Sequence, residues 1–214
     1  MPRTPLTRPT TILLVRHGVT GTTGKVLPGR APGLHLSTKG VEQAQRTAQR
    51  LSELSPSATA LYASPLERTR ETAAPIASAL GLRVRAERGL LECDFGDWTG
   101  KTLSSLRKKP EWRSVQNSPS TFRFPQGESF TEMQLRMWTT LERLAHSHEG
   151  QTIVVVSHAD PIKAAVTYAQ GVPLDLFQRT VISTCSVSAM MLSGSSPVVL
   201  SVNNTGSLKE LIAS

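Results

Sequence analysis

The sequence predicts an α/β fold, a three-layer sandwich in which helices cover both faces of a mostly parallel central sheet. Two apolar runs rich in β-branched residues, at 11–15 (TILLV) and 152–156 (TIVVV), are typical of strands buried on both faces. Strand-like and helix-like segments also alternate along the chain, an order that favours parallel strands joined by helical crossovers. A chain of 214 residues, 38% of them hydrophobic, is large enough to bury the core of such a sheet.

A loop and a helix follow the first strand. Residues 18–33 are rich in Gly, Thr and Pro, which predicts an irregular connection. Ser37 has the side chain of an N-cap, and the residues after it favour a helix because they are mostly Gln, Ala, Arg and Leu. We therefore expect a helix over 40–54.

The next helix has sequence signals at both of its ends. We expect it over 65–80, with Pro65 in its first turn and Gly81 just beyond its last residue. Pro75 has no backbone N–H group, so it should kink or interrupt this helix.

The remaining elements follow from hydrophobic periodicity and turn residues. In chain order they are strands at 60–63 and 83–85, a compact glycine-punctuated segment at 90–100, a short helix over 101–109, an irregular cap loop at 110–126, a long helix over 128–148, a helix over 161–170, and strands at 186–192 and 198–202. The apolar positions of the long helix are Met133, Leu135, Met137, Leu141 and Leu144.

This organisation predicts one domain over 11–205 with a small cap around 101–127, preceded by a flexible leader at 1–10 and followed by a tail at 206–214. The leader contains three prolines and no apolar core, so it does not have the pattern of a secretory signal. No apolar stretch approaches the ~20 residues that cross a bilayer. We expect a cytoplasmic protein with no membrane partner.

The chain is strongly basic, with a formal net charge of +8 and a pI of about 10.1. Such a charge attracts anions, and the densest basic group is Arg107, Lys108 and Lys109. No zinc-finger spacing or aromatic–basic signature accompanies it, so we expect a phosphorylated small molecule and no specific nucleic acid. Cys93 and Cys185 form no CxxC pair and are expected to be reduced, buried thiols.

Polar and charged side chains gather where predicted strands end, which is where parallel sheets bind ligands. They are Arg16, His17 and Gly18 after the first strand, Ser64 and Arg68 after the second, Glu92 after the third, and Ser157 and His158 after the strand at 152–156.

These residue types suit phosphoryl transfer. The transferred group spreads negative charge over three oxygens, which Arg16 and Arg68 can bind as planar, permanently charged donors. A neutral imidazole such as that of His17 is a competent nucleophile near pH 7, and a cationic His158 would stabilise the same charge. Glu92, with a raised pKa, can protonate the leaving oxygen and later deprotonate water. These groups supply the charge without a metal.

Four segments carry these residues, namely 13–20 (LLVRHGVT), 62–73 (YASPLERTRETA), 90–100 (LLECDFGDWTG) and 155–164 (VVSHADPIKA). In this order they resemble the motifs of the histidine phosphatase superfamily, also called the phosphoglycerate mutase-like family, over roughly residues 11–205. The resemblance implies a parallel-sheet α/β sandwich, in agreement with the independent reading of the strands and helices.

The resemblance also implies a role for each matching residue. His17 would become phosphohistidine, Glu92 would be the general acid and base, and Arg16, Arg68 and His158 would form the phosphate pocket. Further contacts to substrate or phosphate are expected from Gly18, Thr20, Thr23, Gly29, Arg30 and Ala159. No metal site is expected.

Three positions depart from the family pattern. Thr23 stands where many members have a phosphate-binding Asn, Val19 where Glu is common, and Ala159 where Gly is common. Ala159 keeps the backbone N–H that can donate to phosphate. The loop over 25–36 adds Arg30 and His35, whose contact with substrate the sequence leaves open, as it does for Trp112 in the cap.

Other readings of these residues remain. Asp160 and Glu128 are rival carboxylates for the role of Glu92, although Glu128 fits better in the first turn of a helix. His17 and His158 are readable as buried structural histidines, and Arg16 and Arg68 as surface ion-pair partners.

The function that we expect is a metal-independent phosphomonoesterase, acting on small phosphorylated metabolites through a phosphohistidine. One alternative is a phosphoglycerate mutase that uses a bisphosphoglycerate primer as cofactor; the short stretch between Glu92 and His158 argues against it, because true mutases carry a longer insertion there. The other is a non-catalytic phosphate- or nucleic-acid-binding module, which the intact set of catalytic residues opposes. We expect a monomer or homodimer, and no cofactor apart from the mutase primer.

Overall fold

The computed structural model describes residues 8–54, 57–194 and 196–208. Most of the expected leader at 1–10 and of the tail at 206–214 therefore lies outside the described residues. Within the described ranges, no helix is long and apolar enough to cross a bilayer.

A six-stranded sheet in the order β3-β2-β4-β1-β5-β6 forms the centre of the molecule. Its strands are β1 (Thr10–Arg16), β2 (Ala60–Ala63), β3 (Val84–Ala86), β4 (Thr152–Ser157), β5 (Val187–Leu192) and β6 (Val198–Asn204). The first four strands in the order pair in parallel, whereas β5 runs antiparallel to both β1 and β6. The predicted mostly parallel sheet is confirmed.

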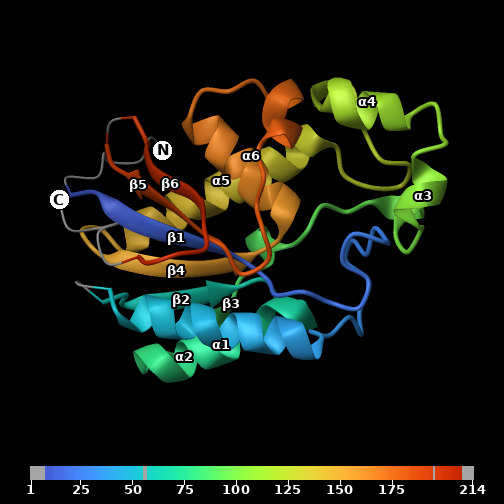
Figure 1. The fold of residues 1–214 in the computed structure, drawn as a ribbon. Helices are drawn as coiled ribbons and strands as arrows, with labels where there is room; N and C mark the ends of the chain where they lie inside the picture. The colour runs from blue at the N-terminus through green and yellow to red at the C-terminus, as the bar shows by residue number, and fades with distance from the viewer. Residues whose placement is uncertain (1–7, 55–56, 195, 209–214) are drawn as a thin grey trace.

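Helices cover both faces of the sheet, as predicted, with α1 and α2 on one side and α5 and α6 on the other (Figure 1). They are α1 (Thr38–Ser52), α2 (Glu67–Leu80), α5 (Phe130–Ser147) and α6 (Ala159–Ala169). Alternate residues of β1 pack against the helices on opposite faces of the sheet, because successive side chains of a strand point to opposite faces. Leu13 packs in the core under α1 and α2, and Leu14 packs in the core with Met137 of α5 and Ile162 of α6.

Several details of the helices differ from the sequence predictions. Ser37 is the N-cap of α1 as expected, with its Oγ accepting from the N–H of Gly40 at 3.2 Å, but the helix already begins at Thr38. Helix α2 continues through Pro75 without interruption, and Pro65 lies before it. Leu135 of α5 is 65% exposed, so it is not part of the core.

The cap is more ordered than the sequence predicted. The range 110–126 contains helix α4 (Trp112–Asn117) and a 3-10 turn at Pro119–Thr121, and α3 (Leu103–Leu106) precedes them. These short elements pack over an aromatic cluster in which Phe124 contacts Phe95 and Trp98, while Trp98 stacks on Trp112 at 6.3 Å between ring centroids. Tertiary packing of this kind stabilises helices too short to form alone.

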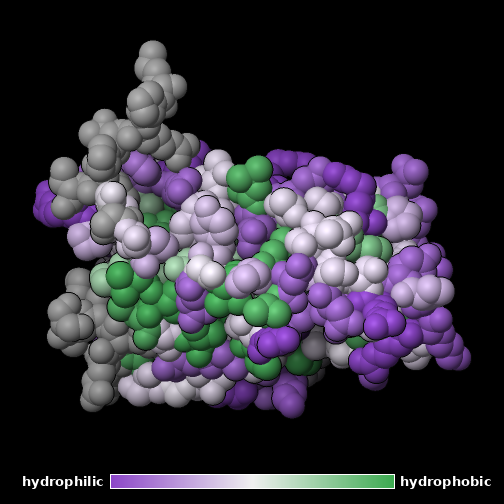
Figure 2. Space-filling model, turned by 90° about the horizontal axis from the view of Figure 1, so that it is seen from above, coloured by the Kyte–Doolittle hydropathy of each residue, from purple (hydrophilic) through white to green (hydrophobic). Residues whose placement is uncertain are grey.

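Hydrophilic residues gather at the end of the molecule that carries α3 and α4, where Arg107 and Lys108 are exposed (Figure 2). The cap also meets the loop that follows β1, since the N–H of Leu27 donates to the carbonyl oxygen of Lys101 at 2.9 Å. The basic surface of the cap therefore adjoins the carboxyl edge of the sheet.

The pairing of β1 with β4 brings the two predicted histidine motifs together. The strands run in register from Thr11 opposite Thr152 to Arg16 opposite Ser157. The N–H of His17 extends this ladder by donating to the carbonyl oxygen of Ser157 at 3.0 Å. His17 and His158 therefore leave neighbouring strands at the same level of the sheet.

Candidate active site

His17 is held as a neutral imidazole whose Nε2 keeps its lone pair. It is 6% exposed, and its Nδ1 lies 2.8 Å from the carbonyl oxygen of Gly18. A carbonyl oxygen only accepts, so Nδ1 carries the proton and Nε2 keeps its lone pair. Burial and the charges of Arg68 and Arg16 lower the pKa of His17 to about 3. At pH 7 the ring is therefore a nucleophile that needs no further deprotonation.

His158 lies against His17, with the ring centroids 5.2 Å apart and the ring planes at 62°. It is fully buried, and its Nε2 is 2.9 Å from the hydroxyl of Ser64. Burial, together with the charge of Arg68, lowers the pKa of His158 well below its usual value. This direction favours the neutral ring and runs against the expected cationic His158. With Ser64 donating to Nε2, the buried Nδ1–H is the group left to donate to a ligand, since Nδ1 has no hydrogen-bond partner among the described residues.

The two arginines present unsatisfied donors. Arg68, on α2, is fully buried and donates from Nη2 to the carbonyl oxygen of Gly29 at 2.8 Å. Its Nε and Nη1 are buried without a hydrogen-bond partner in the described part of the chain, and so is Nε of Arg16. Arg16 is otherwise anchored through Nη1 to the carbonyl oxygen of Ile182 at 2.6 Å. Buried cationic donors without an acceptor are costly, and a phosphate supplies acceptors that fit them.

Helix α6 adds backbone donors at the same place. Its first residue is Ala159, and His158 is the N-cap without a side-chain cap hydrogen bond. The first N–H groups of a helix have no partner within the helix and favour anions. The N–H of Ala159 is therefore placed beside the histidine pair, as the sequence motif predicted.

Glu92 has the titration behaviour of a general acid and base. It is 7% exposed, and its Oε1 accepts from the N–H of Cys93 at 3.0 Å. Burial, followed by the negative charge of Asp160, raises the pKa of Glu92 to about 7, against the opposing charge of Arg68. Near neutral pH this carboxyl is present in both protonation states, as both roles require.

The two rival carboxylates have other partners. Asp160 lies in the first turn of α6 and pairs with Lys163 at 3.3 Å. The prediction that Glu128 lies in the first turn of a helix is wrong, because Ser129 is the N-cap of α5 and the helix begins at Phe130. The sequence signal was real but belonged to Ser129 and Glu132, which form a capping box.

The loop after β1 holds the smaller predicted residues. The N–H of Gly18 donates to Thr72 of α2 at 3.0 Å. A Cβ on Gly18 would meet the carbonyl oxygen of Gly40 at 2.6 Å, so only glycine fits there. The Thr23 hydroxyl accepts from the N–H of Thr20 at 2.9 Å and lies 3.0 Å from the Thr20 hydroxyl. Thr20 and Thr23 thus brace the loop that follows the nucleophile.

Gly29 and Arg30 reach the site from the same loop. Gly29 has φ +51° and presents its carbonyl oxygen to Arg68. Arg30 donates from Nε to the carbonyl oxygen of Glu92 at 2.9 Å, and its Nη2 lies 2.8 Å from Oε2 of Glu128. The structure therefore places Arg30 in contact with the backbone of Glu92.

The sequence gives no hint of Arg136, which also binds the backbone of the Glu92 segment. Its Nη1 donates to the carbonyl oxygen of Gly89 at 2.7 Å and to that of Leu91 at 3.0 Å. Nothing in the local pattern distinguishes Arg136 from an ordinary surface charge of an amphipathic helix. Only the packing of α5 beside residues 88–94 makes it part of the site.

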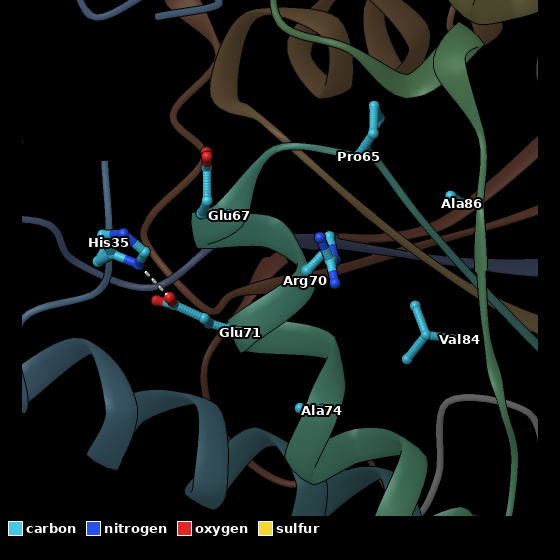
Figure 3. A pocket seen from close by; sticks show the side chains of 8 residues that line it. All are labelled: His35, Pro65, Glu67, Arg70, Glu71, Ala74, Val84 and Ala86. Atoms are coloured by element: carbon cyan, nitrogen blue, oxygen red, sulfur yellow. Dashed lines mark hydrogen bonds and ion pairs between the residues drawn. The ribbon is translucent and has the colours of Figure 1, made fainter. Parts of the chain in front are cut away.

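A cavity of about 710 Å³ opens elsewhere, between α2 and β3 (Figure 3). Arg70 points into it, and His35 pairs with Glu71 at its rim. Neither histidine of the ring pair lines this cavity; its lining residues are His35, Pro65, Glu67, Arg70, Glu71, Ala74, Val84 and Ala86. The chemistry predicted from the sequence belongs to the histidine pair and not to this cavity.

The structure thus assembles the five residues predicted to be catalytic. Arg68 and Arg16 act electrostatically on both His17 and Glu92, and the two imidazoles touch edge to face. The arrangement offers a neutral nucleophile, buried cationic donors and a carboxyl that titrates near pH 7. Within residues 8–54, 57–194 and 196–208, no group of three or more His, Cys, Asp or Glu side chains could hold a metal ion.

Comparison with known proteins agrees with this arrangement. The family model described as "Histidine phosphatase superfamily (branch 1)" matches residues 12–205. Phosphoserine phosphatase 1 of Hydrogenobacter thermophilus is 35% identical over 85% of this chain and 88% of its own length. The probable phosphoglycerate mutase GpmB of Erwinia tasmaniensis is 33% identical over 83% of this chain and 82% of its own length.

A solved structure shares the fold. Phosphoserine phosphatase of Entamoeba histolytica, in complex with 3-phosphoglyceric acid, superposes with a TM-score of 0.82 and 26% identity, covering 92% of this chain and 98% of its own. The motif resemblance seen in the sequence and the fold seen in the structure therefore point to the same group of proteins.

Proposed function

The chain belongs to the histidine phosphatase superfamily, and we propose that it hydrolyses small phosphate monoesters through a phosphohistidine formed on His17. The observation that carries this proposal is the fully buried guanidinium of Arg68, two of whose nitrogens have no hydrogen-bond partner among the described residues. It lies beside a histidine whose Nε2 keeps its lone pair. A phosphate satisfies the first group and accepts attack from the second.

In the first step, Nε2 of His17 attacks phosphorus and the bond to the ester oxygen breaks. Arg16, Arg68, Nδ1–H of His158 and the N–H of Ala159 bind the equatorial oxygens, where the negative charge is spread. The protonated carboxyl of Glu92 gives its proton to the leaving oxygen, and the alcohol departs. The two arginines supply the positive charge, so the step needs no metal ion.

In the second step, water attacks phosphorus and the phosphorus–nitrogen bond of phosphohistidine breaks. The carboxylate of Glu92 accepts a proton from the water, which regenerates its acid form. Inorganic phosphate and neutral His17 result. A pKa of about 7 lets Glu92 serve alternately as acid and base near neutral pH.

The surface charge favours a substrate that carries a second anionic group on its alcohol part. Residues 101–127 contain six basic residues and the single acid Glu111; the basic ones are Lys101, Arg107, Lys108, Lys109, Arg113 and Arg123. A positive cap beside the site attracts substrates with a carboxylate or a second phosphate, and added salt weakens that attraction. Phosphoserine and 3-phosphoglycerate, named with the similar proteins, are the first compounds to assay.

The test measures release of p-nitrophenol from p-nitrophenyl phosphate with and without EDTA. We expect turnover that EDTA does not reduce, and an acid-labile phosphoprotein when the reaction is quenched. His17→Ala should abolish both signals. Turnover by His17→Ala equal to that of the wild type would refute the assignment of the nucleophile.

The mutase reading requires the same residues, and the 33% identity to a probable mutase favours testing it. A mutase returns the phosphoryl group to a second hydroxyl instead of to water. Exchange between 2- and 3-phosphoglycerate that depends on a bisphosphoglycerate primer, and that outpaces phosphate release, would replace hydrolysis as the function.

A further inference from the structure

The general acid proposed above lies on a segment without regular structure. Glu92 follows a 3-10 turn at Arg88–Leu90, and residues 91–95 belong to no helix or strand. A side chain on such a segment keeps its position only if the backbone is fixed by other contacts, and catalytic geometry tolerates errors of about 0.5 Å. The contacts that fix this backbone therefore matter for catalysis.

Arg136 of α5 provides three of these contacts. Besides the carbonyl oxygens of Gly89 and Leu91, its guanidinium reaches that of Glu92, which lies 3.4 Å from Nη2. Three backbone carbonyl oxygens within residues 89–92 are thus bound by one planar group, whose fork geometry fixes their relative positions.

Glu128 and Arg30 complete the arrangement. The carboxylate of Glu128 accepts from Nε of Arg136 at 2.8 Å, from Nη2 of Arg136 at 3.0 Å and from the N–H of Asp94 at 3.0 Å. Arg30 binds the same carboxylate and the carbonyl oxygen of Glu92.

The carboxylate at the centre of this network is ionised. Burial raises the pKa of Glu128, but the hydrogen bonds and charge of Arg136, the N–H of Asp94 and the charge of Arg30 outweigh this effect and leave the pKa below its usual value. The side chains of Arg30, Glu128 and Arg136 are 29%, 18% and 22% exposed, so water competes only weakly with these bonds.

We propose that Arg136, Glu128 and Arg30 form a clamp that positions Glu92 to protonate the leaving oxygen. This inference rests on the proposed function. The three residues are positioning residues, since they contact the backbone of residues 89–94 and not the reacting atoms. Arg30, which the sequence suggested as a substrate contact, acts in this proposal through Glu92.

The test compares two substrates that differ in their need for a general acid. The leaving group of p-nitrophenyl phosphate departs as a stable anion, whereas phenyl phosphate, of nearly the same shape, depends more on protonation. Formation of phosphohistidine is measured in single turnovers for the wild type, Arg136→Gln and Glu128→Gln. Arg143→Gln is the matched control, because Arg143 also extends from α5 to an acidic residue of the neighbouring segment, Glu87, without reaching Glu92.

We expect both clamp variants to lose at least about tenfold more rate with phenyl phosphate than with p-nitrophenyl phosphate, within the range that general acids contribute. Arg143→Gln should leave the ratio of the two rates unchanged. In a Glu92→Gln background, Arg136→Gln should cause no further selective loss, because the group being positioned is already absent.

Equal losses with the two substrates, or a selective loss that persists in the Glu92→Gln background, would overturn the clamp. If Arg136→Gln shows no cooperative thermal unfolding, Glu128→Gln decides the question, since it keeps the shape of the side chain. A wild type that turns over neither substrate would instead refute the proposed function, so the two failures are distinguishable.

Discussion

We expect that the buried guanidinium of Arg68 lowers the free energy of unfolding while it provides donors for phosphate. In Arg68→Met the lost bond to Gly29 removes about 1.5–3 kcal/mol of favourable interaction. The same change removes a buried cation whose desolvation costs several kcal/mol and whose Nε and Nη1 lack partners among the described residues. Methionine fills much of the vacated volume, so the net change should be a stabilisation of about 2 kcal/mol.

Thermal unfolding of the variant and the wild type tests this balance. In a domain of this size, about 2 kcal/mol raises the Tm by roughly 4–8 °C. Inorganic phosphate at about 100 times its Kd should stabilise the wild type by about 2.7 kcal/mol and the variant hardly at all. Arg70→Met is the control, because Arg70 lies two residues further along α2 (Figure 3) and is an exposed residue. Its Tm and phosphate response should match the wild type.

The reasoning fails if Arg68→Met melts several degrees below the wild type, since the guanidinium would then be a net stabilising group. It also fails if phosphate raises the Tm of the variant as much as that of the wild type. Either result would mean that the unpartnered nitrogens of Arg68 are not the donors that bind phosphate.

Three further predictions concern the remaining parts of the site. Because burial and the charge of Asp160 raise the pKa of Glu92 to about 7, the rate of phosphohistidine formation from phenyl phosphate should fall above pH 7. Asp160→Asn removes a charge that raises this pKa, so the fall in rate should move to lower pH, whereas the control Asp97→Asn, at an exposed position, should leave it in place. A pH profile of Asp160→Asn that matches the wild type would contradict the assignment. Gly18→Ala places a Cβ 2.6 Å from the carbonyl oxygen of Gly40 and should destabilise the fold by about 1–3 kcal/mol in urea denaturation, whereas Gly21→Ala, with no atom within 4 Å of its Cβ, should not. Ser64→Ala leaves Nε2 of buried His158 without its partner and should lower the free energy of unfolding by about 1–3 kcal/mol. Nitrogen NMR spectra should show a changed tautomer of the His158 ring, and an unchanged spectrum would show that Ser64 does not orient the ring.

The centre of the sheet was predictable because β1 and β4 are buried along nearly their whole length. The runs at 11–15 and 152–156 are apolar and rich in β-branched residues, which predicts buried strands, and the ends of these strands place His17 and His158 at one edge of the sheet. The cap was less predictable. Helix α4 spans only Trp112–Asn117, too short for a hydrophobic period, and it is stabilised by Trp112 stacking on Trp98, a contact that no local pattern encodes.

The reactive residues were easier to predict than those that hold them. His17, Arg68 and Glu92 lie in motifs, whereas Arg136 lies in the middle of an amphipathic helix and gains its partners only from the packing of α5 beside residues 88–94. The protonation state of His158 was also hidden, because it depends on complete burial next to Arg68. The partners of Arg136 and the protonation state of His158 both depend on charge and burial in the folded structure.

The uninterrupted pairing of β1 with β4 also constrains how such a protein can evolve. An insertion or deletion of one residue in either strand would displace one imidazole by about 3.3 Å and turn it to the opposite side of the sheet. Length changes are therefore tolerable only outside these strands, for example in the segments over 18–36 and 101–127. Related proteins can then differ in the alcohol part of the substrate that they accept, while the residues that react with phosphorus keep their positions.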